Sequence, residues 1–436
     1  MTTYNYKNSN YFSISLFVPF LWFFVVTSRN ISSWFKHDSS YVDPLVLLEE
    51  GSIVDRYFFL LLIFIGIIIL LNRKTEVKDL VNKNKGLILF FLYLLLSILW
   101  SEYKYVSLKR WVKLLGALIM VLIIKTEKDD YESLFSIIRK VVFIHLPLSI
   151  IIIKYFRHYG VSWEKDGSNL MWTGVSLHKN TFGQLLMINN FYFIYEIFFK
   201  NKYNKNNFTL NHDVNIIKRY IYVIYLIMGL YLMNGPGNSR SVTSIIALVI
   251  GIMVLSITSN IKVQTGNVKN RLLKIAILAL GIFIFVNIIS LVIYENPTKD
   301  IATAMTGKDD TLSGRTELWK DIYAIASQNI LFGVGYGAFW IGDIERKLWE
   351  TQIWKPQQGH NGYLDTLAEV GMFGLAFLIM LIITFYRNIF NKQNTKYFSF
   401  SISVLTMIII HNIAESSFLR ATHSLWFLFL FIAIKK

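Results

Sequence analysis

The sequence predicts an all-α polytopic membrane protein with about twelve transmembrane helices, forming a single domain over residues 1–436. Of the 436 residues, 54% are apolar and only 17% are charged. A soluble protein of this composition would leave too much hydrocarbon exposed to water. The apolar residues also occur in runs that are long enough, or nearly so, to cross a bilayer, and no long polar stretch interrupts them.

The predicted spans follow one another along the whole chain. The first has a polar head and lacks a small-residue cleavage site, so we expect it to be retained as a span and not removed as a signal peptide. The twelve ranges are 11–28, 56–72, 86–101, 108–124, 136–154, 181–199, 218–234, 241–258, 273–294, 371–386, 397–413 and 422–434.

The basic residues fall mainly on one side of these spans. With the N-terminus inside, the inside segments hold 24 of the 44 Lys and Arg residues and 8 of the 28 Asp and Glu residues. The inside segments therefore carry the whole formal net charge of +16, and the outside segments carry a net charge of zero. This is the distribution that the positive-inside rule requires. We expect both termini in the cytoplasm, the lipid bilayer as a partner, and no nucleic acid.

The outside segments are where chemistry is expected. Those around 29–55, 155–180 and 295–360 are longer than the inside segments and contain Trp, Tyr, Gly and mixed charges. The 295–360 segment is predicted to be a large external loop with its own short helix. Ser313 can cap that helix, which would carry Leu318, Ile322 and Ile325 on one face.

Two arginines in these segments are candidate site residues. Arg240 follows a turn with two glycines and a proline, and it opens the next span. It could face inward as a functional charge or extend to the lipid headgroups. Arg315 opens the loop helix, where a cation opposes the helix dipole. Either an anionic ligand compensates Arg315, or it pairs with an acidic neighbour: Asp309, Asp310 or Glu317.

His360 begins a polar series at the point where the external loop re-enters the membrane. Asn361, Asp365 and Glu369 follow at i+4 spacing and need partners or a water-filled cavity. A lone histidine is more often structural than catalytic, but this carboxylate series makes a catalytic role equally plausible. Two further polar clusters lie before the sixth span and after the eleventh. Their residues are His178, Lys179 and Asn180, and Glu415 and Arg420.

Other signals limit the kinds of site that the chain can hold. Cysteine is absent, which excludes disulfides, thiolate metal sites and a cysteine nucleophile. No residues with metal-ligand spacing stand out, so no metal and no cofactor is predicted. The glycines of GVGYG, residues 333–337, follow no strand, so a tight turn is expected instead of a phosphate loop. Four aromatic residues could stack on sugar rings or could form a membrane-interface belt: Trp319, Tyr323, Tyr336 and Trp340.

Several of these segments together resemble the O-antigen ligase and polysaccharide polymerase superfamily. The resemblance is most specific in SGRTELWKDIYAIASQNILFGVGYGAFW and the following HNGYLDTLAEVGMFGL. SLHKNTFGQLL and the SRS at 239–241 resemble its other outward motifs. FVPFLWFFVVTSRNISSW and SLKRWVKLLGAL are similar to the bacterial exopolysaccharide polymerase branch.

The resemblance implies a metal-independent glycosyltransferase with a GT-C-like fold in the bacterial inner membrane, with its active site facing the periplasm. Its donor would be an undecaprenyl-diphosphate-linked oligosaccharide and its acceptor a glycan. The resemblance assigns Arg240 and Arg315 to the donor diphosphate and gives His360 an essential role. It also implies that chain-length regulator and flippase proteins are partners.

Three functions fit these observations. The leading interpretation is polymerisation of lipid-linked repeat units into O-antigen or exopolysaccharide. The alternative is a ligase that moves the lipid-linked glycan to lipid A core or to protein. A transporter of the same lipid-linked sugars is less favoured, because transporters place polar residues near the bilayer midplane and often have repeated halves. Here the polar clusters are all outward and no repeat is visible.

Overall fold

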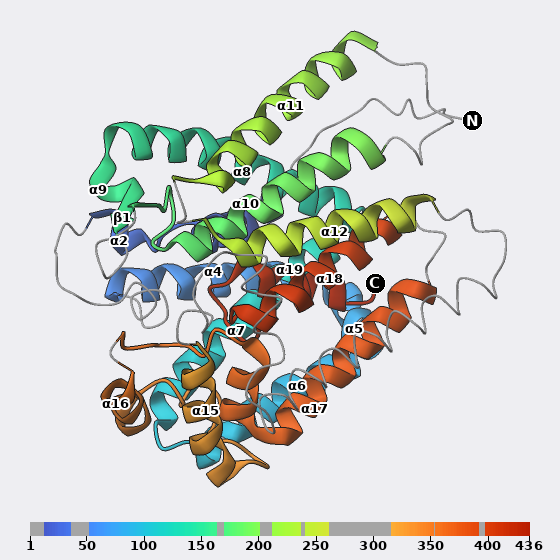
Figure 1. The fold of residues 1–436 in the computed structure, drawn as a ribbon. Helices are drawn as coiled ribbons and strands as arrows, with labels where there is room; N and C mark the ends of the chain where they lie inside the picture. The colour runs from blue at the N-terminus through green and yellow to red at the C-terminus, as the bar shows by residue number, and fades with distance from the viewer. Residues whose placement is uncertain are drawn as a thin grey trace.

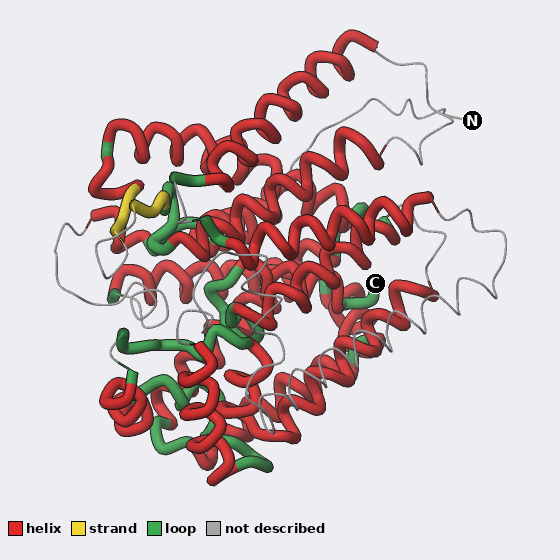
Figure 2. The backbone as a smooth tube through the Cα atoms, in the orientation of Figure 1, coloured by secondary structure: helices red, strands yellow, loops and turns green. Residues whose placement is uncertain are grey.

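The computed structural model is a bundle of helices (Figure 1). It describes residues 13–35, 52–163, 170–200, 212–236, 240–260, 315–352, 354–391 and 397–436. Within these ranges helices dominate, and two short strands pair in antiparallel fashion with Val161 opposite Trp172 (Figure 2).

The first half of the described chain contains the strand pair and the helices before and around it. Its elements are η1 (Ile14–Leu16), α1 (Phe17–Val26), α2 (Ile31–Phe35), α4 (Ile53–Leu71), α5 (Lys74–Lys83), α6 (Lys85–Leu96), η2 (Ser97–Trp100), α7 (Lys104–Lys125), α8 (Asp130–Tyr155), α9 (Arg157–Gly160), β1 (Val161–Trp163), β2 (Leu170–Trp172), α10 (Lys179–Ile194) and η3 (Tyr195–Phe199).

The described ranges of the second half contain helices and loops and no strand. Its elements are α11 (His212–Asn234), α12 (Val242–Asn260), α15 (Arg315–Ala326), η5 (Ser327–Asn329), α16 (Gly342–Thr351), α17 (Gly362–Asn391), α18 (Phe398–Ala414) and α19 (Ser424–Ala433).

The predicted spans agree with helices wherever the structure describes them, and 273–294 lies outside the described residues. Among the described helices, five are long and apolar enough to cross a membrane, or up to six if the bent pair α5 and α6 counts as one span. Three more apolar helices are shorter: Ile14–Val26, α18 and α19. The protein is therefore a mostly helical, polytopic membrane protein, and twelve spans and a GT-C-like fold stay predictions.

One end of the bundle collects ion pairs between segments that the charge distribution assigns to the cytoplasm. Arg73 lies 2.9 Å from Glu127, and Lys200 lies 2.9 Å from Glu132. The Tyr397 hydroxyl also donates to Glu132, at 3.1 Å. Segments far apart in sequence, predicted to share one side of the membrane, thus lie together. That this end faces the cytoplasm stays a prediction.

The opposite end is organised by a buried arginine from the loop after α1. Arg29 Nε donates to the Val175 carbonyl at 3.2 Å, and its Nη2 donates to the carbonyls of Gly174 and Ser176, both at 3.0 Å. Burial lowers the pKa of Arg29 to about 10, which still leaves it charged at neutral pH. Arg29 therefore fixes the segment that leads into α10.

Glycines allow two helices to pack closely in the first half. A Cβ at Gly66 of α4 would lie 2.8 Å from Ile119 and 2.9 Å from Met120 of α7. A Cβ at Gly116 of α7 would lie 2.7 Å from Ile63 of α4. Small residues of this kind let membrane helices approach one another, because lipid offers no hydrophobic drive for their association. The α4–α7 contact positions the outer part of α7 beside the site described below.

Helix α17 is broken at Gly371, which has φ +69°. The segment after η5 crosses this break: Met372 N donates to the Ile330 carbonyl at 2.8 Å, and Phe373 N donates to the Leu331 carbonyl at 3.2 Å. These bonds satisfy backbone groups that the break removes from the helix, as a membrane interior requires. The polar series from Asn361 to Glu369 therefore lies before the break, and the apolar span lies after it.

Candidate functional site

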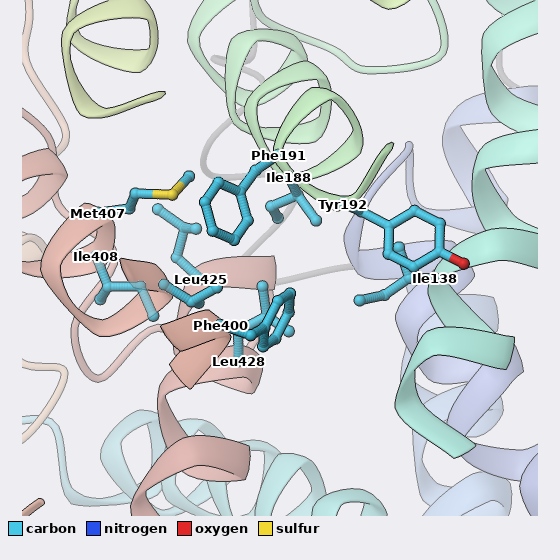
Figure 3. A pocket seen from close by; sticks show the side chains of 10 residues that line it. Ile138, Ile188, Phe191, Tyr192, Phe400, Met407, Ile408, Leu425 and Leu428 are labelled. Carbon is cyan, nitrogen blue, oxygen red and sulfur yellow. The ribbon is translucent and has the colours of Figure 1, made fainter. Parts of the chain in front are cut away.

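One gap in the described bundle is lined almost entirely by apolar side chains. It lies between α8, α10, α18 and α19, and the rings of Phe191 and Phe400 face into it (Figure 3). Its other lining side chains are aliphatic apart from Met407 and Tyr192. We interpret this gap as imperfect helix packing, and we look for the site among the polar clusters.

Those polar clusters lie at the end of the bundle opposite the Arg73–Glu127 pair. Helix α18 shows this, because it begins after Tyr397, which bonds Glu132, and ends at Ala414, next to Glu415. A helix of 17 residues is about 25 Å long. Glu415 is thus separated from the predicted cytoplasmic end by most of a bilayer thickness.

Glu415 is the common partner of three predicted site residues. Its Oε1 accepts from Asn180 Nδ2 at 2.6 Å and from Arg315 Nη2 at 3.1 Å. Its Oε2 lies 3.2 Å from His360 Nδ1. We call Asn180, Arg315, His360 and Glu415 the Glu415 cluster. Four segments far apart in sequence, the starts of α10, α15 and α17 and the end of α18, meet at this carboxylate.

Arg315 pairs with an acidic residue that is distant in sequence and not with one of its sequence neighbours. The proposed acidic neighbours were Asp309, Asp310 and Glu317, of which the two aspartates lie outside the described residues. Arg315 instead pairs with Glu415, and its Nη1 donates to the Ala414 carbonyl at 2.5 Å. The guanidinium also meets the carbonyl end of α18, where a cation is favoured by the helix dipole.

The charge of Glu415 depends on its partners. Burial alone would raise the pKa of this carboxyl, since only 4% of the side chain is exposed. The charges of His360 and Arg315 outweigh burial and hold the pKa of Glu415 well below its ordinary value of 4.5. Glu415 is therefore a carboxylate at neutral pH. It accepts hydrogen bonds and does not donate them.

His360 is held in an uncommon backbone conformation. Its φ is +48°, in the left-handed region that few non-glycine residues adopt. Such conformations persist where the surroundings impose them, often at functional sites. The preceding Gly359 N donates to Asp365 Oδ1 at 2.9 Å, and the carbonyl of Gly359 accepts from Trp319 Nε1 at 2.6 Å. The backbone is thus fixed on both sides of Gly359, which sets the direction of the imidazole of His360.

Asp365 is the second carboxylate of the site, and it acts on the His360 loop. Besides Gly359, it accepts from Trp340 Nε1 at 3.1 Å, and Arg420 Nη2 lies 3.4 Å from its Oδ2. Asp365 and Arg420 are both buried. The two predicted polar clusters, 360–369 and 415–420, are therefore one structure, joined at Glu415 and again at Asp365.

Arg240 lies near this site but does not enter the Glu415 cluster in the described structure. It is exposed and immediately precedes Ser241, which packs against Gly183 of α10. Ser244, one turn into α12, lies 3.4 Å from His411 Nε2 of α18. Arg240 is therefore at the same end of the bundle as Glu415, between the starts of α10 and α12.

The remaining candidates have structural contacts of their own. His178 Nδ1 accepts from Asn180 N at 3.2 Å and caps α10, and Asn361 Oδ1 accepts from Tyr363 N and Leu364 N, both at 3.1 Å, and caps α17. Lys179 is half-buried at the start of α10. A direct role in substrate binding stays a prediction for His178, Lys179 and Asn361.

Three of the four aromatic candidates are packed into the protein. Trp319, Tyr336 and Trp340 are buried, and the Tyr336 hydroxyl donates to the Leu419 carbonyl at 2.8 Å. Their side chains are packed among the loops. Trp354, which the sequence did not single out, has its ring 5.8 Å from the ring of His360 and is half-buried. It is the aromatic side chain best placed beside the imidazole.

Sequence reasoning also missed the contribution of α7. Arg110 Nη1 donates to the Gly337 carbonyl at 2.6 Å, and Gly337 N donates to Glu369 Oε2 at 3.0 Å. The glycines 333, 335 and 337 all have positive φ, so the GVGYG segment forms tight turns, as expected. Basic residues early in a predicted span could have signalled this contact, because charges there need a partner.

Comparison with known proteins supports the resemblance. Residues 222–379 match the model of the O-antigen ligase family. This match supports the resemblance of the chain to the O-antigen ligase and polysaccharide polymerase superfamily. The match includes Arg240, Arg315, His360 and Asp365, whereas Asn180, Glu415 and Arg420 lie outside it.

A curated relative points to the same superfamily. The chain is 36% identical over 90 residues to the exopolysaccharide production protein ExoQ of Rhizobium meliloti (strain 1021). This alignment covers 20% of the present chain and 21% of ExoQ, about a fifth of each protein. It agrees with the resemblance of the chain to the exopolysaccharide branch.

Proposed function

We propose that this protein is a membrane glycosyltransferase that polymerises undecaprenyl-diphosphate-linked oligosaccharide repeats on the outer face of the bacterial inner membrane. The observation that carries the proposal is the meeting of Arg315 and His360 on one carboxylate, Glu415. A guanidinium suited to a diphosphate thus lies beside an imidazole suited to a hydroxyl. Glycosyl transfer from a lipid diphosphate needs both groups at one place.

The proposed reaction assigns one step to each group. The oxygen of an acceptor sugar hydroxyl attacks the anomeric carbon of the donor, and the bond from that carbon to the diphosphate oxygen breaks. The hydroxyl proton passes to His360 Nε2. The lipid diphosphate leaves with the bonding electron pair, and a new glycosidic bond joins the two glycans.

The geometry of His360 suits proton transfer at Nε2. Since Glu415 is a carboxylate, Nδ1 is the ring nitrogen that carries a proton toward it, and a neutral imidazole then has its lone pair on Nε2. When Nε2 takes the proton, Glu415 stabilises the imidazolium that forms. Glu415 is thus a positioning residue that acts through His360.

The arginines are proposed to stabilise the leaving group. Arg315 is 20% exposed, and its forked guanidinium can bind phosphate oxygens in bidentate fashion. Arg240 is exposed at the same end of the bundle and is proposed to bind the other phosphate. Negative charge grows on the diphosphate as the bond breaks, so these contacts strengthen toward the transition state. The proposed mechanism uses no metal.

A ligase is the second candidate, because the matched family model is described as O-antigen ligase. The two activities differ in the acceptor and not in the donor chemistry. Purified protein would be incubated with lipid-linked repeats alone, and then with added lipid A core. A ladder of longer lipid-linked chains in the first incubation supports the polymerase, and product only with lipid A core supports the ligase. Chain-length regulators and flippases are proposed as partners in either case.

The donor site is tested through Arg315. Arg315→Ala and Arg315→Lys should each lose most activity while the protein still inserts into the membrane, because an ammonium cannot reproduce a bidentate fork. The expected loss for one charge-stabilising contact is about 10²–10³-fold in turnover. Arg346→Lys on exposed α16 is the matched control. Full activity of Arg315→Lys would contradict the proposed bidentate role.

A further inference from the structure

A second basic cleft lies beside the Glu415 cluster without sharing its residues. It opens to the surface, and part of its space is open solvent. Its lining comes from α7, from the turn at 336–337, from α17 and from the turn before α19. The lining residues are Arg110, Lys113, Tyr336, Gly337, Glu369, Leu419, Arg420, Ala421 and Thr422.

The charges around this cleft favour an anion. Three basic residues and one carboxylate line it, so the charged side chains give a net charge of +2. The carboxylate of Glu369 accepts from the Gly337 backbone at 3.0 Å and lies 4.0 Å from Arg420. Arg110 and Lys113 are three residues apart on α7, so they project from the same face of the helix.

The cations are held in place by the fold. The Arg110 guanidinium donates to the Gly337 carbonyl at 2.6 Å, and Lys113 Nζ lies 4.6 Å from the ring centroid of Phe59. Gly337 itself has φ +67°, and a Cβ there would lie 2.8 Å from Arg110 Cδ. This turn therefore requires glycine. Because glycine has no Cβ, the aliphatic part of Arg110 can pack directly against the backbone of Gly337. Arg420 is anchored from behind by Asp365.

The cleft is also coupled to the proposed reaction centre. Arg420 lines it and contacts Asp365, and Asp365 accepts from Gly359, the residue before His360. The cleft lies near the start of α7, because Arg110 is six residues along the helix, or about 9 Å. Both sites are thus at the same end of the bundle, where headgroups of membrane lipids are in reach.

We propose that this cleft binds the diphosphate of a second lipid-linked saccharide, the acceptor. The inference rests on the proposed function and extends it. When one lipid-linked chain is transferred to another, the donor loses its lipid diphosphate and the acceptor keeps its own. A polymerising enzyme must therefore hold two diphosphates at once. Two forked guanidinium groups and an ammonium match a diphosphate better than a singly charged phosphodiester headgroup.

The test counts bound diphosphates on the full chain. The protein is placed in nanodiscs of zwitterionic phosphatidylcholine, and native mass spectrometry measures how many copies of a sugar-free polyprenyl diphosphate it binds. Wild type should bind two copies. Lys113→Gln should lower the affinity for the second copy by about tenfold or more, so that one copy is observed. Lys113→Arg, which keeps the charge, should bind two. Lys109→Gln, on the same helix but outside the cleft lining, is the matched control and should bind two.

The donor site is separated from the cleft by the same measurement. Arg315→Ala should bind one copy, and the double variant with Lys113→Gln should bind none. If Arg315→Ala keeps two copies while Lys113→Gln keeps one, the donor site of the proposed function fails and the cleft stands. If Lys113→Gln keeps two copies, the cleft proposal is overturned whatever Arg315→Ala does. Displacement of the second copy by an equal concentration of phosphatidylglycerol would also overturn it, in favour of a lipid headgroup site.

Discussion

At the scale of residues, the carboxylate of Glu415 joins the candidate site residues Arg315 and His360. Glu415 contacts the two groups that the proposed chemistry needs. Both groups, His360 in its protonated form and Arg315, lower the pKa of Glu415. The arrangement is reciprocal, since the carboxylate fixes the directions of both the guanidinium and the imidazole. A change at any of the three should therefore alter the other two.

The role of His360 is tested by two substitutions. His360→Asn should nearly stop turnover, by about 10²–10⁴-fold, because the general base is removed, while asparagine tolerates the left-handed backbone. His360→Gln should be equally impaired, since an amide cannot take the proton. Turnover is measured for wild type and for both variants under the same conditions. An active His360→Gln would leave only a positioning role.

Glu415→Gln tests the ion pair through stability. The folded-state pKa of Glu415 is lowered, so its contribution is present above the ordinary value of 4.5 and is lost as pH falls through the folded value. The variant should lose about 1–3 kcal/mol, less than a fully buried pair because Arg315 is partly exposed. The difference in thermal unfolding in detergent should be present at about pH 5 and shrink as the pH falls below 4.5.

The stability test of Glu415→Gln has a matched control in α16. Glu350→Gln removes an exposed carboxylate of α16 and should unfold like wild type. A stability difference between wild type and Glu415→Gln that grows as the pH falls below 4.5 would reverse the sign and refute a lowered pKa.

At the scale of elements, the break in α17 connects the membrane span to the site. Before Gly371 the chain carries Asp365 and Glu369, and after it the chain is apolar. The carbonyls of Ile330 and Leu331 replace helical partners at the break. The segment after η5 is thus hydrogen-bonded to the membrane span at Gly371.

Gly371→Ala tests this connection. A Cβ would collide with the Leu331 carbonyl, and the residue would be held at a positive φ. The left-handed conformation alone costs about 1–2 kcal/mol for a non-glycine residue, so we expect a lower unfolding temperature in detergent and a loss of glycosyl transfer. Gly86→Ala is the control, because the nearest neighbour to its Cβ would be Leu381 at 3.7 Å. Equal unfolding temperatures for the two variants would show that the break carries no such constraint.

At the scale of the whole molecule, the two polar ends of the bundle are chemically different. One end holds the Arg73–Glu127 and Lys200–Glu132 pairs, and the other holds the Glu415 cluster and the cleft beside it. Helix α18 connects them. The predicted topology places these two ends on opposite sides of the membrane.

Single cysteines can test this orientation, because the native chain contains none. Lys78→Cys in α5 and Glu350→Cys in α16 replace exposed residues at opposite ends of the proposed topology. A membrane-impermeant maleimide added to intact spheroplasts should label the cysteine at 350 and leave the cysteine at 78 unlabelled. Labelling of both positions, or of position 78 alone, would overturn the topology and the periplasmic placement of the site.

The sequence alone determined much of this protein. Apolar runs predicted helices where the structure describes them, and charge predicted which loops lie together, because both signals are local or additive along the chain. The polar motifs also identified Arg315, His360 and Glu415 as candidates. Only the tertiary structure decided that Glu415 is the common partner of Arg315 and His360. It also decided that Tyr336 and Trp340 are buried and that Arg110 and Lys113 line a second cleft. These contacts join residues up to about 300 positions apart, and spacing along a chain carries no information about such distances until helix packing brings the segments together.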